Sequence, residues 1–366
     1  MSTSAAPLLS HVPTPVAAPP PAAVPRGWIV SPRYDTVFFT ASVLVPMLLW
    51  AAFSLDFLTG VGVYVVFQLA FNMPHNFQTW TMSVLDGEDR AKNGRRYLIA
   101  AIVILAVFAI PMALSPDGVY PWVRDALIYW GYYHLVRQHY GFQRLYERKM
   151  GGVSELESKL YGRYLDAVSY LPFLIRWQNP EWMTIHAGDL TMWVRHPVLP
   201  AAVWIPILVL YGGVILAAIV HHVWMAARGR PAMWPRALLL LSVTFAFGMA
   251  NLAIHELLVA IALVTSFHNL QYLGLVGFHN KTRAAMGHVE GNRPIAWLAE
   301  ARWIPYALAT FLYGVLLFIP RGAFSTLRYA ELPITLVVAL HYYVDSRMWR
   351  FKDYPRRGLW LKLKGG

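Results

Sequence analysis

Histidine side chains recur in segments of this chain that otherwise consist mainly of apolar and aromatic residues. Neutral imidazole is the commonest metal ligand near neutral pH. An ionisable side chain within a hydrophobic membrane segment is costly and is usually functional. We therefore predict a metal site formed by the histidines of these segments, which are His75, His134, His139, His268 and His341.

Helical spacing limits which of these residues can act together. His341 and Asp345 are four residues apart, so they share a helix face, and Asp345 is a further candidate ligand or a group that orients one. The alternative is that Asp345 pairs with a nearby arginine. His134 and His139 are separated by about 140° around a helix and need not point to the same place.

Other polar side chains near the histidines are candidates for supporting the ligands or lining a substrate pocket. Arg137 would neutralise a carboxylate or bind an anionic head group. The chain also has 15 Trp, 20 Tyr and 18 Phe residues, which could wall a pocket for a lipid-like substrate or form the usual interfacial belt. The predicted neighbours are Arg137, Gln138, Gln143, Asn269 and Tyr272.

The elements that position these residues are predicted to be membrane-spanning helices. Apolar residues make up 57% of the 366 positions, charged residues make up 14%, and the mean hydropathy is +0.43. Several runs reach the roughly 20 apolar residues that a spanning helix needs, without the alternation of a barrel strand. We predict an all-α transmembrane bundle with about ten spans, near 36–56, 59–83, 97–115, 120–143, 161–177, 199–226, 235–251, 254–280, 302–320 and 330–350.

Basic residues orient this bundle. With both termini in the cytoplasm, most of the 31 Lys and Arg residues fall in cytoplasmic loops, as the positive-inside rule requires. The predicted location is a bacterial-type inner membrane. The histidines then lie at one depth, in the cytoplasmic half, on helices of one direction, so they can converge. The predicted domains are a disordered Pro/Ala-rich tail (1–27), one transmembrane domain (28–352) and a basic cytoplasmic tail (353–366).

Composition also excludes some functions. The net charge of +12 is explained by the cytoplasmic head groups, so no nucleic-acid partner is predicted. The absence of cysteine excludes disulfides and thiolate chemistry. Nothing in the sequence identifies a protein partner.

Four short motifs surround the candidate ligands: MPHN at 73–76, QHYG at 138–141, SFHNLQYLGL around His268, and Leu340-His341 with Asp345. They resemble motifs of the bacterial Brp/Blh-type β-carotene 15,15′-dioxygenases, which are polytopic membrane proteins with a histidine-bound non-haem iron. The resemblance implies iron ligation by His75, His139 and His268, and a carotenoid substrate with O₂. Asn76 stands where that family has a glycine, and Tyr272 stands where it has a second histidine. The HYYxD…WR ending is also similar to that of an uncharacterised bacterial membrane family, which implies no activity.

Three functions remain open from the sequence. The favoured one is a membrane-embedded non-haem iron oxygenase that activates O₂ against an isoprenoid or other lipid-like substrate, with no catalytic residue identified beyond the metal ligands. The second is a haem-binding electron-transfer protein in which His134 or His139 faces His268. The third is a proton-coupled transporter with a histidine relay.

Overall fold

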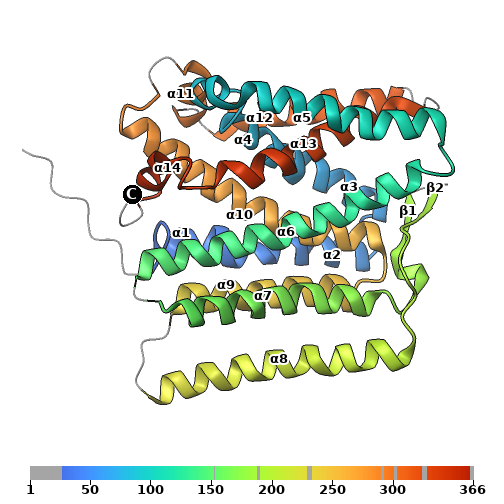
Figure 1. The fold of residues 1–366 in the computed structure, drawn as a ribbon, viewed down its shortest axis with the longest axis vertical. Helices are drawn as coiled ribbons and strands as arrows, with labels where there is room; N and C mark the ends of the chain where they lie inside the picture. Colours follow the sequence, from blue (N-terminus) through green and yellow to red (C-terminus); the bar gives the residue numbers. More distant parts are fainter. Residues whose placement is uncertain are drawn as a thin grey trace, which may run out of the picture.

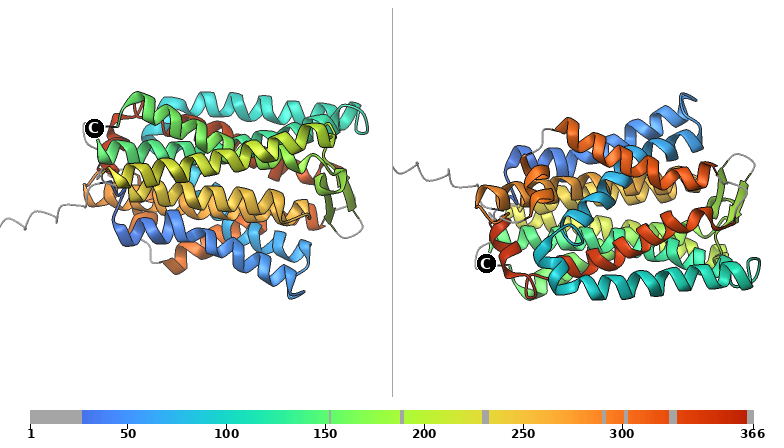
Figure 2. Two further views of the ribbon diagram at one scale, coloured as in Figure 1. Left: turned by 90° about the horizontal axis from the view of Figure 1, so that it is seen from below. Right: turned by 90° about the horizontal axis from the view of Figure 1, so that it is seen from above.

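The computed structural model describes residues 27–151, 153–187, 190–228, 233–289, 292–300, 303–323 and 328–362. Within these residues the chain forms a bundle of helices aligned along one axis, with a single two-stranded antiparallel hairpin at one end (Figures 1 and 2). The predicted all-α class is confirmed apart from this hairpin. The predicted tail 1–27 lies outside the described residues except for Gly27.

The described chain begins with two interrupted helices, Pro32–Ser54 and 60–81, and continues through long helices. The first half comprises α1 (Pro32–Asp35), η1 (Thr36–Thr40), η2 (Ala41–Val43), α2 (Leu44–Ser54), α3 (Gly60–Phe67), η3 (Gln68–Asn72), α4 (Met73–Thr81), α5 (Gly87–Leu114), α6 (Tyr120–Met150) and α7 (Glu155–Arg176). The second half comprises η4 (Pro180–Met183), β1 (Thr184–Ala187), β2 (Leu190–Trp193), α8 (Ala201–Ala227), α9 (Trp234–Leu252), α10 (Leu257–Ala285), α11 (Arg293–Glu300), α12 (Trp303–Ala323), η5 (Arg328–Glu331), α13 (Leu332–Met348) and α14 (Pro355–Trp360).

The prediction of ten membrane spans is wrong. Among the described residues, five helical segments are long and apolar enough to cross a membrane: Pro32–Ser54, α5, α8, α9 and α10. The other predicted spans also form helices, but they are shorter, interrupted or more polar. For example, α6 carries Arg124, Asp125 and Arg137, and α13 has only 17 residues. The prediction of ten spans considered the length and apolar character of each segment but not the free-energy cost of placing these charges in a membrane.

The spanning helices differ in how far neighbouring helices cover them. α5 and α8 lie at opposite edges of the bundle and expose most of their apolar side chains (Figure 1). α10 lies inside the bundle and is buried along most of its length. The apolar surfaces of α5 and α8 therefore suit contact with lipid, whereas α10 forms the centre on which the other helices pack.

The helices that carry His75, His134, His268 and His341 all begin at the hairpin end. Tyr120, at the start of α6, donates a hydrogen bond to Glu331, just before α13. A Cβ on Gly60, at the start of α3, would lie 3.8 Å from Cγ of Glu256, just before α10. The starts of these helices therefore lie together, and α3–α4, α6, α10 and α13 run in the same direction (Figure 1). Residues at similar distances from the starts then lie at one level.

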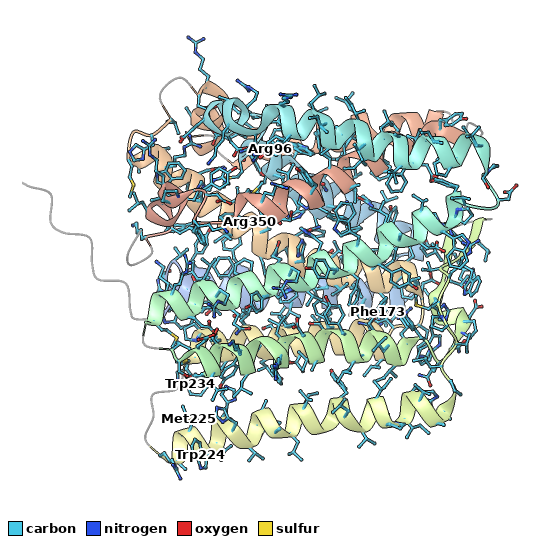
Figure 3. The ribbon with its side chains drawn as sticks, viewed as in Figure 1. Arg96, Phe173, Trp224, Met225, Trp234 and Arg350 are labelled. Carbon is cyan, nitrogen blue, oxygen red and sulfur yellow. The ribbon has the colours of Figure 1, made fainter. Side chains whose placement is uncertain are left out.

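Polar contacts close the opposite end of the bundle. Arg283 at the end of α10 forms an ion pair with Asp86 before α5. Arg357 of α14 donates from Nη2 to the Met82 carbonyl after α4 at 2.9 Å. Figure 3 labels Arg96 and Arg350 toward this end and Phe173 toward the hairpin. The C-terminal segment is thus held against the ends of the helices that carry the histidines.

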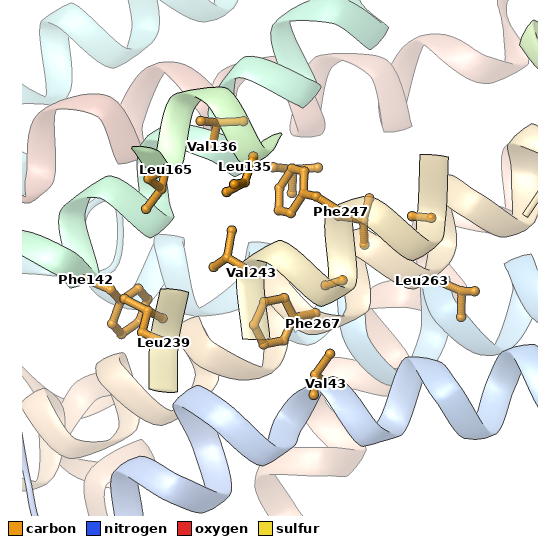
Figure 4. Packing of buried hydrophobic residues seen from close by; sticks show 14 of the residues in the cluster. Val43, Leu135, Val136, Phe142, Leu165, Leu239, Val243, Phe247, Leu263 and Phe267 are labelled. Atoms are coloured by element: carbon orange, nitrogen blue, oxygen red, sulfur yellow. The ribbon is translucent and has the colours of Figure 1, made fainter. Parts of the chain in front are cut away.

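The largest apolar core lies among α6, α7, α9 and α10, with η1 and η2 beside them. Phe142 of α6, Phe247 of α9 and Phe267 of α10 are almost fully buried there (Figure 4). Between helices in lipid, such packing stabilises mainly through van der Waals contact, since lipid tails are as apolar as the core. The core therefore depends on close fit, which fixes α10 relative to α6.

Gly274 gives a direct test of that fit. A Cβ at Gly274 would lie 2.6 Å from Cβ of Phe38, so α10 and η1 approach too closely for a side chain. We expect Gly274→Ala to lower the free energy of unfolding by about 1–3 kcal/mol, as overpacking typically does. Gly277→Ala is the matched control, because nothing lies within 4 Å of its built Cβ. Thermal unfolding in detergent measures both, and equal stability of the two variants would contradict the packing.

Candidate metal centre

The backbone around His75 departs from a regular α-helix. The π-helical segment η3 ends at Asn72, and Pro74 follows within the first turn of α4. Proline lacks the N–H that an α-helical ladder needs, and π segments occur often at functional sites. Asn76 Nδ2 donates to the Asn72 carbonyl at 2.8 Å, where the chain passes from π to α geometry. This irregular turn positions His75 in the interior, where its side chain is 2% exposed.

Three buried histidines from three helices converge at this level. His75 of α4, His134 of α6 and His341 of α13 each offer one ring nitrogen, and these nitrogens all lie within 4.8 Å of one another. The Nε2 atoms of His75 and His341 are 2.8 Å apart. These residues, called here the histidine triad, have the donor type and separation of a metal site.

A chain of hydroxyl groups orients His341. Its Nδ1 lies 2.7 Å from Oγ1 of Thr79, which lies 3.2 Å from the hydroxyl of Tyr272. The Tyr272 hydroxyl donates in turn to Sδ of Met348 at 3.1 Å. In the arrangement that satisfies all three contacts, Nδ1 of His341 donates to Thr79, and the Thr79 hydroxyl donates to Tyr272. His341 then carries its proton on Nδ1, and the lone pair of its Nε2 faces the centre of the triad.

His134 is held between an aromatic ring and a carboxylate. Its ring stacks on Tyr342, with the centroids 4.7 Å apart. Oδ2 of Asp345 lies 3.8 Å from Nε2 of His134, too far for a hydrogen bond but close enough for a shared ion. Oδ1 of Asp345 has no hydrogen-bond partner among the described residues.

The other predicted ligands, His268 and His139, lie beside the triad. The ring of His268 is 4.8 Å from that of His75 and 5.0 Å from that of His134, centroid to centroid. His139 lies one step further out, 6.2 Å from His268, and stacks on Phe267. The structure thus places His268 against the triad and His139 in the apolar core.

The predicted supporting residues separate into two groups. Tyr272 packs against His75 at 4.4 Å between centroids, and Asn269 lines the cavity described below. Gln138 donates to the His268 carbonyl at 2.9 Å and so joins α6 to α10. Gln143 instead donates to Glu147 of its own helix at 3.0 Å.

Arg137 faces away from the triad, although it lies between His134 and His139 in sequence. Its Nη1 is 3.8 Å from Oδ1 of Asp166 on α7, and both side chains are about two-fifths exposed, at 39% and 42%. Its guanidinium also lies over the ring of Tyr140. Arg137 therefore lies on a partly exposed side of α6, away from the triad.

Two residues at the site were not predicted from the sequence, Thr79 and Tyr342. Thr79 lies four positions after His75, so helical spacing alone places it on the same face. Tyr342 follows His341 directly, and its contact with His134 depends on how α13 packs against α6. The first could have been found from spacing, whereas the second could not.

A cavity of about 640 Å³ adjoins the triad, and His75, His134, His268 and His341 line one part of it. Along α6 its lining residues run from Arg124 to Leu135, which corresponds to about 16 Å at the rise of an α-helix. The cavity therefore extends from the histidines toward the hairpin end. Most of its wall is apolar, including Leu127, Ile128, Ile261, Val264 and Val338.

The buried polar atoms of the site fit a metal ion. Among the described residues, Nε2 of His134 and Oδ1 of Asp345 have no hydrogen-bond partner. A buried polar group without a partner costs about 1–3 kcal/mol. A cation would satisfy such lone pairs, and this is the main reason to treat the cluster as more than core packing.

No protein-family model, curated protein or solved structure matches this chain. The donor atoms, their burial and the adjoining cavity are thus the basis for assigning a function. The resemblance to carotenoid dioxygenases remains a prediction. The same holds for the ligand set of His75, His139 and His268 that it implies.

Proposed function

We propose that this protein is a membrane-embedded metalloenzyme, a non-haem iron oxygenase that acts on a lipid-like substrate. The observation that carries the proposal is the histidine triad, whose buried ring nitrogens converge within 4.8 Å from three separate helices. The adjoining apolar cavity supports a hydrophobic substrate. The five apolar helices support a location in the membrane.

The donor set favours iron held without a porphyrin. His75, His134 and His341 would hold the ion, and Asp345 is near enough to add a carboxylate after a small side-chain movement. Imidazole with carboxylate suits non-haem iron, which supplies O₂ activation when open positions remain. Bis-histidine haem needs two imidazoles on opposite faces of a porphyrin. The rings of His134 and His268, one of the pairs considered for haem, lie only 5.0 Å apart between centroids, too close for a porphyrin plane between them.

The residues around the triad would position the metal ligands and keep water away from the reacting position. His75, His134 and His341 would hold one ion, because their converging ring nitrogens all lie within 4.8 Å of one another. Thr79 and Tyr342 hold two of the rings in place. The apolar cavity wall excludes water from the reacting position, which protects reactive species from side reactions.

The proposed orientation puts the triad in the cytoplasmic half of a bacterial-type inner membrane. Arg96 and Arg350 lie toward the end of the bundle opposite the hairpin (Figure 3), where Arg283 and Arg357 also make their contacts. Positively charged residues favour the cytoplasmic side. The hairpin would then face the other side, and the cavity would extend toward it from the histidines.

Elemental analysis combined with an optical spectrum tests the proposal directly. Protein purified in mild detergent and loaded with Fe²⁺ under anaerobic conditions is expected to bind about one iron per chain, because one group of ligands converges. The spectrum is expected to lack a Soret band. The double variant His75→Ala/His341→Ala is expected to bind none. His186→Ala is the matched control, because His186 lies on the exposed hairpin.

Three results would reject the proposed function. A Soret band in the purified protein would indicate haem instead. Iron binding by the double variant at the wild-type stoichiometry would place the metal elsewhere. Failure of the wild-type protein to bind Fe²⁺, Mn²⁺ or Zn²⁺ would leave a histidine relay in a transporter as the better account.

Thr79 provides a further prediction about metal affinity. Thr79→Val removes the hydroxyl that orients His341 but keeps the size of the side chain, and we expect metal affinity to fall by about 10-fold or more. Thr79→Ser keeps the hydroxyl and is expected to stay close to the wild type. Competition with a chelator of known affinity measures the difference. Equal affinities of the valine and serine variants would contradict a role for this hydrogen bond.

A further inference from the structure

We propose that the cavity binds one extended hydrocarbon chain of a neutral single-chain amphiphile, with the polar group at the hairpin end and the chain directed toward the histidine triad. This inference rests on the proposed function for the meaning of the triad, but binding of the amphiphile is a separate property. The class of ligand follows from the shape of the cavity, from the position of its polar residues and from its route of entry.

The shape of the cavity favours a single extended chain. Its lining residues on α10 run from Leu257 to Asn269, about 18 Å along the helix, and those on α6 run over a similar length. A volume of about 640 Å³ over that length is large enough for one extended chain. The middle of the cavity is lined by Leu127, Ile128 and Val264, which suit methylene groups.

Charged residues line the cavity at the end away from the histidines. Arg124 and Glu331 both belong to the lining, near the starts of α6 and α13. Arg124 donates to Asp125 at 2.8 Å, and Glu331 accepts from the neutral hydroxyl of Tyr120. A guanidinium and a carboxylate at one end of the cavity offer a donor and an acceptor, which suits a hydroxyl group better than a head group that carries one charge.

The cavity wall on α3 also reaches the outside of the bundle. Val61 and Val65 line the cavity, yet they are 40% and 44% exposed. α3 packs against α10, α2 and β1, while α13 packs against α4 and α6, so the two helices bound the cavity from different sides. An amphiphile in the membrane can therefore enter laterally past Val61 and Val65, polar group toward the hairpin.

The chemistry follows from this placement. The polar group and the triad lie about 16 Å apart, so the position of the chain nearest the histidines is remote from the head group. Oxidation there would cleave a C=C bond deep in the chain into two carbonyl groups. Both atoms of O₂ would enter the products, so this step needs no external reductant.

Binding of radiolabelled palmityl alcohol to protein in digitonin tests the inference. The wild-type protein is expected to retain about one equivalent per chain, as one cavity of this size holds one such ligand. Unlabelled palmityl alcohol should compete at least 10-fold better than hexadecane, palmitate or dipalmitoyl phosphatidylcholine. Val264→Trp fills the middle of the cavity and is expected to lower binding at least 10-fold. Ile219→Trp is the matched control, on the exposed face of α8.

The outcomes separate this inference from the proposed function. Loss of alcohol binding in Val264→Trp with iron still bound supports the cavity as the chain site; Leu127→Phe tests the same point if that variant does not fold. Iron binding by the wild type without alcohol binding would overturn only the inference, as would stronger competition by palmitate, hexadecane or the two-chain lipid. Alcohol binding without iron binding would reject only the proposed function.

Discussion

Replacing His134 with alanine is expected to lower the metal affinity of the protein by more than about 100-fold. Loss of a partner outside the ligand shell already costs about 10–100-fold, so loss of a ligand should cost more. His134 contributes one of the three nitrogens that lie within 4.8 Å of one another. Its replacement would leave His75, His341 and Asp345 as candidate ligands, and α6 would no longer contribute a ligand.

His139→Ala is the informative comparison, because the resemblance to the dioxygenases implies His139 as a ligand. Nδ1 of His139 lies 2.7 Å from the Leu135 carbonyl, and its ring packs on Phe267 in the core. We expect this variant to lose stability but to keep metal affinity within about 10-fold of the wild type, which is the lower limit for an outer partner. Calorimetric or chelator titration measures both variants. A greater loss in His139→Ala than in His134→Ala would reject the triad in favour of the ligand set based on resemblance.

The sequence predicted the class of fold and the residues around which the site is built. Apolar runs in the chain were sufficient to predict helices, and the positions of His75, His134 and His341 at one depth predicted convergence. The structure adds the reason for that convergence: their helices begin at the same end and pack around α10. This part was predictable because depth depends only on the position of a residue within its helix.

Other features depend on how helices rotate about their axes. His134 and His139 differ by about 140° on α6, so the packing of α6 against α10 decides which of them faces His75 and His341. The rotation of a helix about its axis cannot be predicted from a single sequence. The number of spans was overestimated for a different reason, since helices such as α6 are long but carry charged residues within the predicted span. The cavity could not be predicted either, because its walls come from helices distant in sequence.

Arg176→Met is expected to destabilise the protein by about 3–5 kcal/mol. The Arg176 side chain is fully buried at the end of α7 and donates only to backbone carbonyls, those of Trp182, Ala250, Ile254 and His255, at 2.6–3.0 Å. Hydrogen bonds from a charged group contribute about 1.5–3 kcal/mol each, and an orphaned buried acceptor costs about 1–3 kcal/mol. Methionine fills similar space but satisfies none of these acceptors. Thermal unfolding in detergent micelles should therefore show a clear loss.

Two further variants separate geometry from charge at this position. Arg176→Lys keeps the positive charge, but an ammonium group cannot reproduce the planar fork of a guanidinium, so we expect an intermediate loss. Arg356→Met is the control, because its pairing with Glu88 at 3.7 Å is exposed and should contribute no more than about 1 kcal/mol. If Arg176→Met unfolded at the same temperature as Arg356→Met, the four carbonyl contacts would not hold the turn between α9 and α10. Since α10 begins at that turn and carries His268, which packs against His75 and His134, metal affinity is expected to fall in Arg176→Met before the protein unfolds.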